Sequence, residues 1–241
     1  SSHRSCAPNP SSFGAGWMGP EPPEIAIPDA VRQAARRRIN ELSGDATGIL
    51  ALAALGPDVP EHVVERVVSR GEPDRYLEAF QELRDEGLLS ATGERIAAVV
   101  HAHHDVTPPS VRRELHLEVA EELERSGGSA SLRAEHLQAG NAPVDQLAPA
   151  CLAAADEVMA DDAPTALEWL DAIPPSAIDP IPIATRRVEA YVRTGLPVEA
   201  IRAAAPVLST GTGEHLGTRV HVATSYIQAR LPLQAAQVMR E

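Results

Sequence analysis

The sequence contains no lysine, few aromatic residues and only two cysteines. All 21 basic residues among the 241 are arginines, which excludes any mechanism that needs a catalytic or phosphate-binding lysine within this chain. Cys6 and Cys151 lie far apart, so they predict no disulfide framework and are typical of a reducing compartment. No apolar run approaches the roughly 20 residues that a membrane-spanning helix needs, and no signal sequence is evident. We therefore expect a cytoplasmic protein.

Positive charge is also scarce, with 21 basic against 34 acidic residues and a net charge of -13. This surplus disfavours broad binding to nucleic acids or anionic membranes, so we expect direct contact with neither. Residues 129–181 carry nine acids and one arginine, whereas residues 182–241 carry four acids and seven arginines. The asymmetry either steers a partner or reflects composition alone.

Local patterns divide the chain into three parts. Residues 1–28 are rich in Pro, Gly and Ser without apolar periodicity, so we expect a linker, a cloning remnant or a disordered segment. Residues 29–107 show short helical patterns, with Asp45 as the expected N-cap of the second. Apolar runs over 88–90 and 96–100, around a Gly-containing turn, predict a β-hairpin. Short helices followed by a hairpin predict a winged-helix domain.

The helix that would enter DNA in a winged helix is expected over residues 74–86. It carries five acidic residues against two arginines. Because phosphates would repel this helix, we interpret the winged helix as a packing module rather than a DNA-binding one.

Residues 108–241 repeat with a period of 34 to 35 residues. Tyr191, Leu196 and Pro197 recur as Tyr226, Leu231 and Pro232. This is the helix–turn–helix period of tetratricopeptide repeats. Helix pairs are expected over 111–140, 144–173, 182–208 and 214–241. The last pair has no polar capping helix, so we expect a C-terminally truncated array. The predicted fold class is mainly α, with a winged-helix domain followed by an α-solenoid of tetratricopeptide-like helix pairs.

Five short runs follow one another in a suggestive order. They are Ile27–Arg32, Ala51–Gly56, Phe80–Leu89, His103–Val106 and Arg112–His116. Together they resemble the middle of MalT-like, large LuxR-family regulators, which are signal-transduction ATPases that control bacterial transcription. In that family a nucleotide-binding ATPase precedes the winged helix, and a helix-turn-helix DNA-binding domain follows the repeats. The resemblance implies that ATP or ADP binds an ATPase domain upstream in cis, and that this chain holds only the two central parts.

The resemblance also implies a nucleotide-sensing role for His104. Its position after the hairpin matches the histidine that contacts the phosphates of bound ADP in this ATPase class; a water-exposed histidine at a hairpin end is the alternative. The connection from Val106 to Pro109 is shorter than in the family. His101, His103 and His104 lack the spacing of known zinc sites, so we expect no metal. We expect no cofactor in this chain either.

The first helix of each tetratricopeptide repeat lines the concave surface of the array. If Tyr191 and Tyr226 point inward, five polar side chains face that groove. They are Thr185, Glu189, Arg193, Thr224 and Gln228. Such side chains suit a small-molecule inducer or a protein partner, and ordinary solvent exposure is the alternative reading.

No nucleophile lies beside a base in a recognisable motif, so we predict no catalytic residues and no enzyme activity in this chain. The predicted function is that of the central sensor region of an ATP-dependent LuxR/MalT-type transcriptional regulator. An inducer or partner would bind the helical repeats, and the winged helix would relay occupancy to the ATPase, with homo-oligomer formation on activation. The alternative is a tetratricopeptide protein-interaction scaffold without a nucleotide switch.

Overall fold

The structure is a computed structural model that describes residues 28–56, 58–89, 99, 103, 107–175, 177–209 and 216–239. These residues fold mainly into α-helices, as the sequence predicts. The first group comprises α1 (Asp29–Ile39), α2 (Gly44–Ala53), α3 (Glu61–Ser69) and α4 (Pro73–Asp85). The second comprises α6 (Pro109–Ser126), α7 (Ala130–Ala139), α8 (Val144–Val158), α9 (Ala163–Asp171), α10 (Pro180–Arg193), α11 (Pro197–Ala203), α12 (Ala205–Leu208), α13 (Leu216–Gln228) and α14 (Pro232–Val238).

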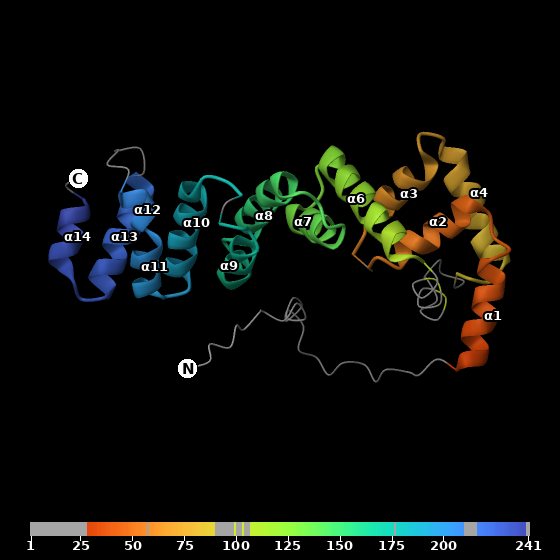
Figure 1. Ribbon diagram of the computed structural model, residues 1–241, viewed down its shortest axis with the longest axis horizontal. Helices are drawn as coiled ribbons and strands as arrows, with labels where there is room; N and C mark the ends of the chain where they lie inside the picture. Colours follow the sequence, from red (N-terminus) through yellow and green to blue (C-terminus); the bar gives the residue numbers. More distant parts are fainter. Residues whose placement is uncertain are drawn as a thin grey trace, which may run out of the picture.

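The molecule is elongated, with α1–α4 gathered at one end and α14 at the other (Figure 1). From α7 to α12 each helix packs on the one before it, α13 packs on α11, and α14 packs on α13. Helix α10 additionally contacts α8, α12 and α13. The pairs α6–α7, α8–α9, α10–α11 and α13–α14 fall within a few residues of the four predicted pairs. No described helix has both the length and the apolar character that crossing a bilayer would require.

Helices α1–α4 enclose one hydrophobic core, whose fully buried members include Leu50, Leu52, Val63 and Leu83. A polar contact also joins α2 to α4. The Glu82 carboxylate accepts hydrogen bonds from the backbone N and the Oγ of Ser43, at 2.8 and 2.5 Å.

The predicted N-cap of α2 is wrong by two positions. Ser43, not Asp45, caps the helix, because its Oγ accepts a hydrogen bond from the backbone N of Ala46 at 3.2 Å. Asp45 lies one residue inside α2 and accepts instead from Nε and Nη2 of Arg75 on α4, at 3.0 and 2.9 Å. The Asp45 carboxylate therefore connects α2 to α4. Serine and aspartate are both suitable N-cap residues, and here Ser43 caps α2.

The predicted β-hairpin falls mostly outside the described residues. Within the described part, Leu89 forms an isolated β-bridge and no longer strand occurs. Val99, which we assigned to the second strand, is helical and buried in the core of α1–α4, so that assignment is wrong. His103, which follows the predicted hairpin, is helical and buried as well. The strand preference of β-branched residues is weak, and burial in the core overrides it here.

The 35-residue sequence repeat is also a repeat of one turn geometry. After α10, Gly195 adopts φ +73°, and Leu196 N donates to Tyr191 O at 2.8 Å. After α13, Arg230 adopts φ +62°, and Leu231 N donates to Tyr226 O at 2.7 Å. In both turns a left-handed residue ends the first helix and a proline begins the second, which is a Schellman-type helix end.

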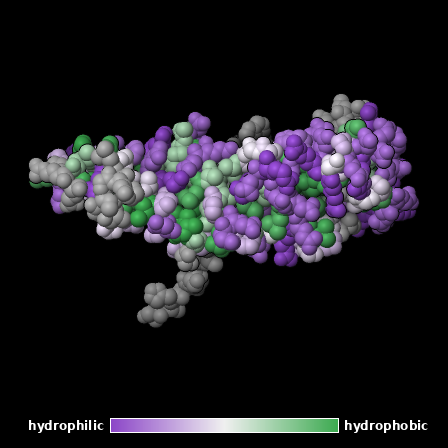
Figure 2. Space-filling view, turned by 90° about the horizontal axis from the view of Figure 1, so that it is seen from above, coloured by the Kyte–Doolittle hydropathy of each residue, from purple (hydrophilic) through white to green (hydrophobic). Residues whose placement is uncertain are grey.

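Arginines of α10 neutralise part of the acidic segment that precedes them. Arg186 donates to both carboxylate oxygens of Asp156 on α8 at 2.6 Å, and Arg187 pairs with Asp171 on α9 at 2.7 Å. Ion pairs between the acidic segment and the arginine-rich segment that follows it therefore connect neighbouring helix pairs. In Figure 2, hydrophilic residues cover most of the visible face over the α1–α7 end, and hydrophobic residues are more frequent toward the α14 end.

Candidate functional site

Helix α6 contributes to two hydrophobic cores at once. Val119 and Leu123, one helical turn apart, are fully buried in the core of α1–α4. Ala120 belongs to the next core, with Ala134 and Leu137 of α7. Accordingly, α6 contacts α2, α3 and α7. Because packed interiors are dense, a shift of α6 would disturb both cores.

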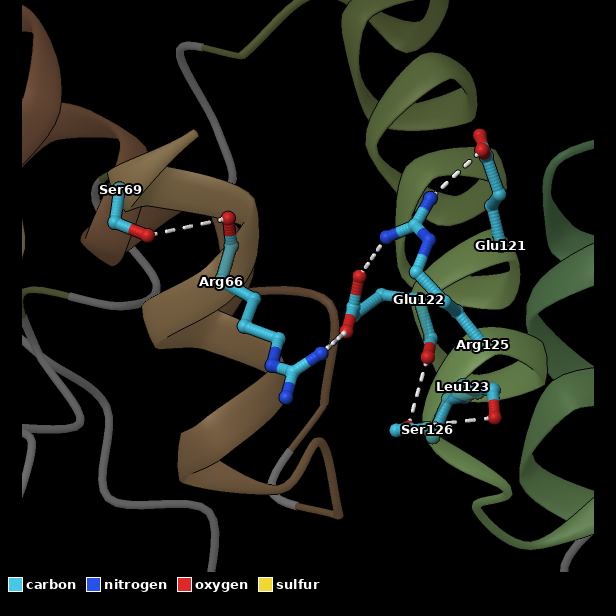
Figure 3. A network of polar contacts seen from close by, with 7 residues as sticks. All are labelled: Arg66, Ser69, Glu121, Glu122, Leu123, Arg125 and Ser126. Atoms are coloured by element: carbon cyan, nitrogen blue, oxygen red, sulfur yellow. Dashed lines mark hydrogen bonds and ion pairs between the residues drawn. The ribbon is translucent and has the colours of Figure 1, made fainter. Parts of the chain in front are cut away.

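A network of charged side chains holds α6 to α3 (Figure 3). Arg66 on α3 donates from Nη1 to Glu122 Oε1 at 3.2 Å, and Arg125 donates to Glu122 and to Glu121. The Glu122 side chain is only 4% exposed, whereas those of Arg66 and Arg125 are 60% and 56% exposed. The buried carboxylate is thus compensated by two guanidinium groups that remain in contact with water.

A cavity of about 310 Å³ lies beside this junction, between the α2–α3 loop, α6 and α7. Its apolar lining comes from Leu55, Val59, Leu132 and Ala139. Its polar lining comes from Asp58, His116, Glu135 and His136. The cavity therefore combines an aliphatic surface with a few ionisable groups, which is the usual make-up of a small-molecule site.

The two histidines of the cavity contact each other directly. Nδ1 of His116 lies 2.8 Å from Nδ1 of His136, and the ring centroids are 4.9 Å apart. One Nδ1 must donate and the other accept, so the accepting ring is neutral and carries its proton on Nε2. The donating ring carries a proton on Nδ1, and its Nε2 is bare when that ring is neutral as well.

Burial keeps this histidine pair uncharged. It lowers the pKa of His136 to about 4, with a smaller contribution from His116. Burial also lowers the pKa of His116, with a further decrease from the nearby charge of Arg112. At neutral pH the pair therefore supplies one hydrogen-bond donor and one acceptor but no positive charge.

The two carboxylates of the cavity, Asp58 and Glu135, are exposed and interact with each other unfavourably. Although Glu135 is exposed as a residue, partial burial of its carboxyl group raises the pKa, and the negative charge of Asp58 raises it further. Within the described residues neither carboxylate has an ion-pair partner. The cavity is thus lined by two like charges, and the pKa of one of them is perturbed, which makes the cavity a candidate functional site.

The structure places the predicted groove residues on α10 and α13, two helices in contact. Glu189 accepts from both Nε and Nη2 of Arg193 on the same helix, at 3.0 and 2.9 Å. The Thr224 hydroxyl donates to Val220 O in its own helix at 2.9 Å. Thr185 is half-buried and Gln228 is exposed. These side chains lie on neighbouring helices, and none of them lines the cavity beside α6.

Two further points concern histidines, one a predicted site residue and the other a contact that the sequence did not predict. His104 lies outside the described residues. The pair His116–His136 did not emerge from the sequence, because its members are 20 residues apart on different helices. The available signal was the position of His136 between Ala134 and Leu137, on a helix face that proves to be buried.

Comparison with known proteins gives no match from which a function could be inferred. No family model matches the sequence, and neither a curated protein nor a solved structure matches it.

Proposed function

We propose that this chain is the central sensing region of a bacterial ATP-dependent transcriptional regulator of the MalT-like, large LuxR type. In this proposal a winged-helix module spans residues 29–107, and a tetratricopeptide-like solenoid spans residues 108–241. An inducer or protein partner binds the solenoid, and its occupancy is passed through the winged-helix module to an ATPase. The order of the five family-like runs and the succession of helix pairs support this reading.

The observation that carries the proposal is the double role of α6. A sensor must have two states that differ in ligand affinity, and some element must differ between them. Helix α6 is the first helix of the repeats, and it is packed into the core of α1–α4 through Val119 and Leu123. The pairing of its Glu122 with Arg66 adds a polar connection. Ligand binding at the repeats would reach the first module through this helix.

The polar contacts of α4 support a packing role for the first module. Arg75, one of the two arginines in the helix that would enter DNA, is engaged by Asp45 of α2. Glu82 of the same helix is engaged by Ser43. The remaining charge of the helix is strongly acidic, which disfavours contact with phosphates.

Sequencing the coding region on both sides of this segment tests the proposal. A continuous reading frame with a phosphate-binding loop upstream and a basic helix-turn-helix downstream is the expected result. A frame with neither feature would contradict it and favour the interaction scaffold.

Ligand binding is tested on the purified chain by thermal shift against sugars, nucleotides and other small metabolites. A ligand of the predicted groove should raise the unfolding temperature, and Glu189→Ala or Arg193→Ala should remove that rise. A rise that survives both substitutions would place the ligand elsewhere in the chain.

A further inference from the structure

The cavity beside α6 is lined by two carboxylates and by no arginine. Asp58 comes from the α2–α3 loop and Glu135 from α7, so two separate segments bring the carboxylates together. The neutral histidine pair beside them adds hydrogen-bonding capacity without positive charge. A positively charged group is therefore the ligand head that this cavity favours.

The rest of the lining indicates an organic cation rather than a metal ion. The volume of about 310 Å³ lies at the lower end of small-molecule sites and is far larger than a metal ion needs. Leu55, Val59 and Leu132 provide aliphatic surface, which has no function toward a metal. Among the described residues, no group of three or more His, Cys, Asp or Glu side chains is arranged to hold a metal ion.

We propose that this cavity binds a small amine-bearing molecule, with its ammonium group between Asp58 and Glu135 and its apolar body against Leu55, Val59 and Leu132. The inference deepens the proposed function, on which it rests for its biological meaning, by naming the chemical class of a ligand. A bound amine would contact the α2–α3 loop and α7 together, on either side of α6. This is the junction through which the proposed signal passes.

Three probes with the same branched aliphatic body and different heads test this inference. They are isoamylamine, isoamyl alcohol and isovalerate, which are cationic, neutral and anionic at pH 7. Each is titrated into the whole chain, and chemical-shift changes in the amide spectrum give the dissociation constant. Isoamylamine should bind in a saturable manner and shift the amides of 55–59 and 132–139, whereas the other two should bind at least about tenfold more weakly.

Two conservative substitutions test the placement of the ammonium group. Asp58→Asn and Glu135→Gln remove one charge each from exposed side chains and should not impair folding. Each should weaken isoamylamine binding by about fivefold, the effect of losing one partly screened ion pair. Glu168→Gln on α9 makes the same change at an exposed, distant position and should leave the dissociation constant within about twofold.

Several results would overturn the inference. These are equal binding of the three probes, no effect of the two carboxylate substitutions, or no saturable binding of isoamylamine. Tight Zn²⁺ binding that His116→Gln abolishes would show a metal site instead. None of these results bears on the reading frame around the segment, so the failure of this inference is distinguishable from failure of the proposed function.

Discussion

Glu122 of α6 and Arg66 of α3 form an ion pair at 3.2 Å in which the carboxylate is buried and the guanidinium is exposed. Arg125 approaches the same carboxylate from within α6. A buried charge is tolerated only when it is paired, whereas an exposed one is solvated in any case. The energetic importance of this network therefore lies with Glu122 rather than with its arginine partners.

Glu122→Ala should lower the free energy of unfolding by about 1–2 kcal/mol, because two charge-assisted hydrogen bonds and the side-chain packing are lost while both arginines are rehydrated. Urea unfolding followed by circular dichroism measures the change. Glu121→Ala is the matched control: it removes a 72% exposed carboxylate that pairs with the same Arg125. Its effect should stay below about 0.5 kcal/mol, and equal effects of the two substitutions would contradict the argument.

At the two equivalent turns of the 35-residue repeat, introducing a glycine should raise the free energy of unfolding, and removing a glycine should lower it. Arg230 holds a left-handed backbone that disfavours side chains, so Arg230→Gly should raise the free energy of unfolding by up to about 1 kcal/mol. Gly195 occupies the same position in the preceding repeat, and Gly195→Ala should lower it by about 1 kcal/mol. Both changes are measured by urea unfolding.

Gly217 in α13 provides the control for this pair. It has ordinary helical backbone and open space for a Cβ, and it is the second residue of α13, so Gly217→Ala should stabilise the chain by up to about 0.5 kcal/mol. A stabilising effect of Gly195→Ala as well would show that the left-handed conformation of the turn does not determine the change in the free energy of unfolding.

Local sequence signals predicted most helices, because each is marked by spacing and by its end residues. The 34–35-residue period located the turns at Gly195 and Arg230, since Leu-Pro follows each of them. The start of α4 at Pro73 was also predictable, because proline fits the first helical turn. These features depend only on residues close together in the chain.

Features that depend on distant residues were not predictable. Nothing near Val99 in the sequence shows that the core of α1–α4 surrounds it, so its β-branched neighbours suggested a strand. The contact between His116 and His136 depends on how α6 packs on α7. The pairing of Asp156 with Arg186 likewise depends on the packing of α10 on α8, whereas the sequence showed only an acidic segment followed by an arginine-rich one.

Cys151 of α8 is a buried free cysteine and should resist thiol reagents. Its side chain is inaccessible, and burial raises the pKa of the thiol to about 11, so almost no thiolate forms at pH 8. Mass spectrometry after iodoacetamide treatment at pH 8 should show Cys151 unmodified in the folded chain and modified in about 6 M urea. Rapid labelling without denaturant would contradict the buried position.

The histidine pair predicts that stability falls on mild acidification. The unfolded chain binds a proton at His136 near pH 6.5, whereas the folded chain does so only near pH 4. The unfolded state therefore holds more protons between these values, so this stabilising contribution is complete above about pH 6.5 and decreases as pH falls toward 4. The lowered pKa of His116 acts in the same direction. The decrease should reach at most about 3 kcal/mol for His136.

Glu135 acts in the opposite direction, because its raised pKa makes the folded state hold a proton more tightly than the unfolded state does. The decisive measurement is therefore the slope of unfolding free energy against pH between 5 and 6.5, obtained from urea unfolding. His136→Gln should flatten that slope, whatever its effect on stability at pH 7. His62→Gln, at an exposed position on α3, should leave the slope unchanged. A slope that persists in His136→Gln would mean that other groups, and not this pair, bind the extra proton on unfolding.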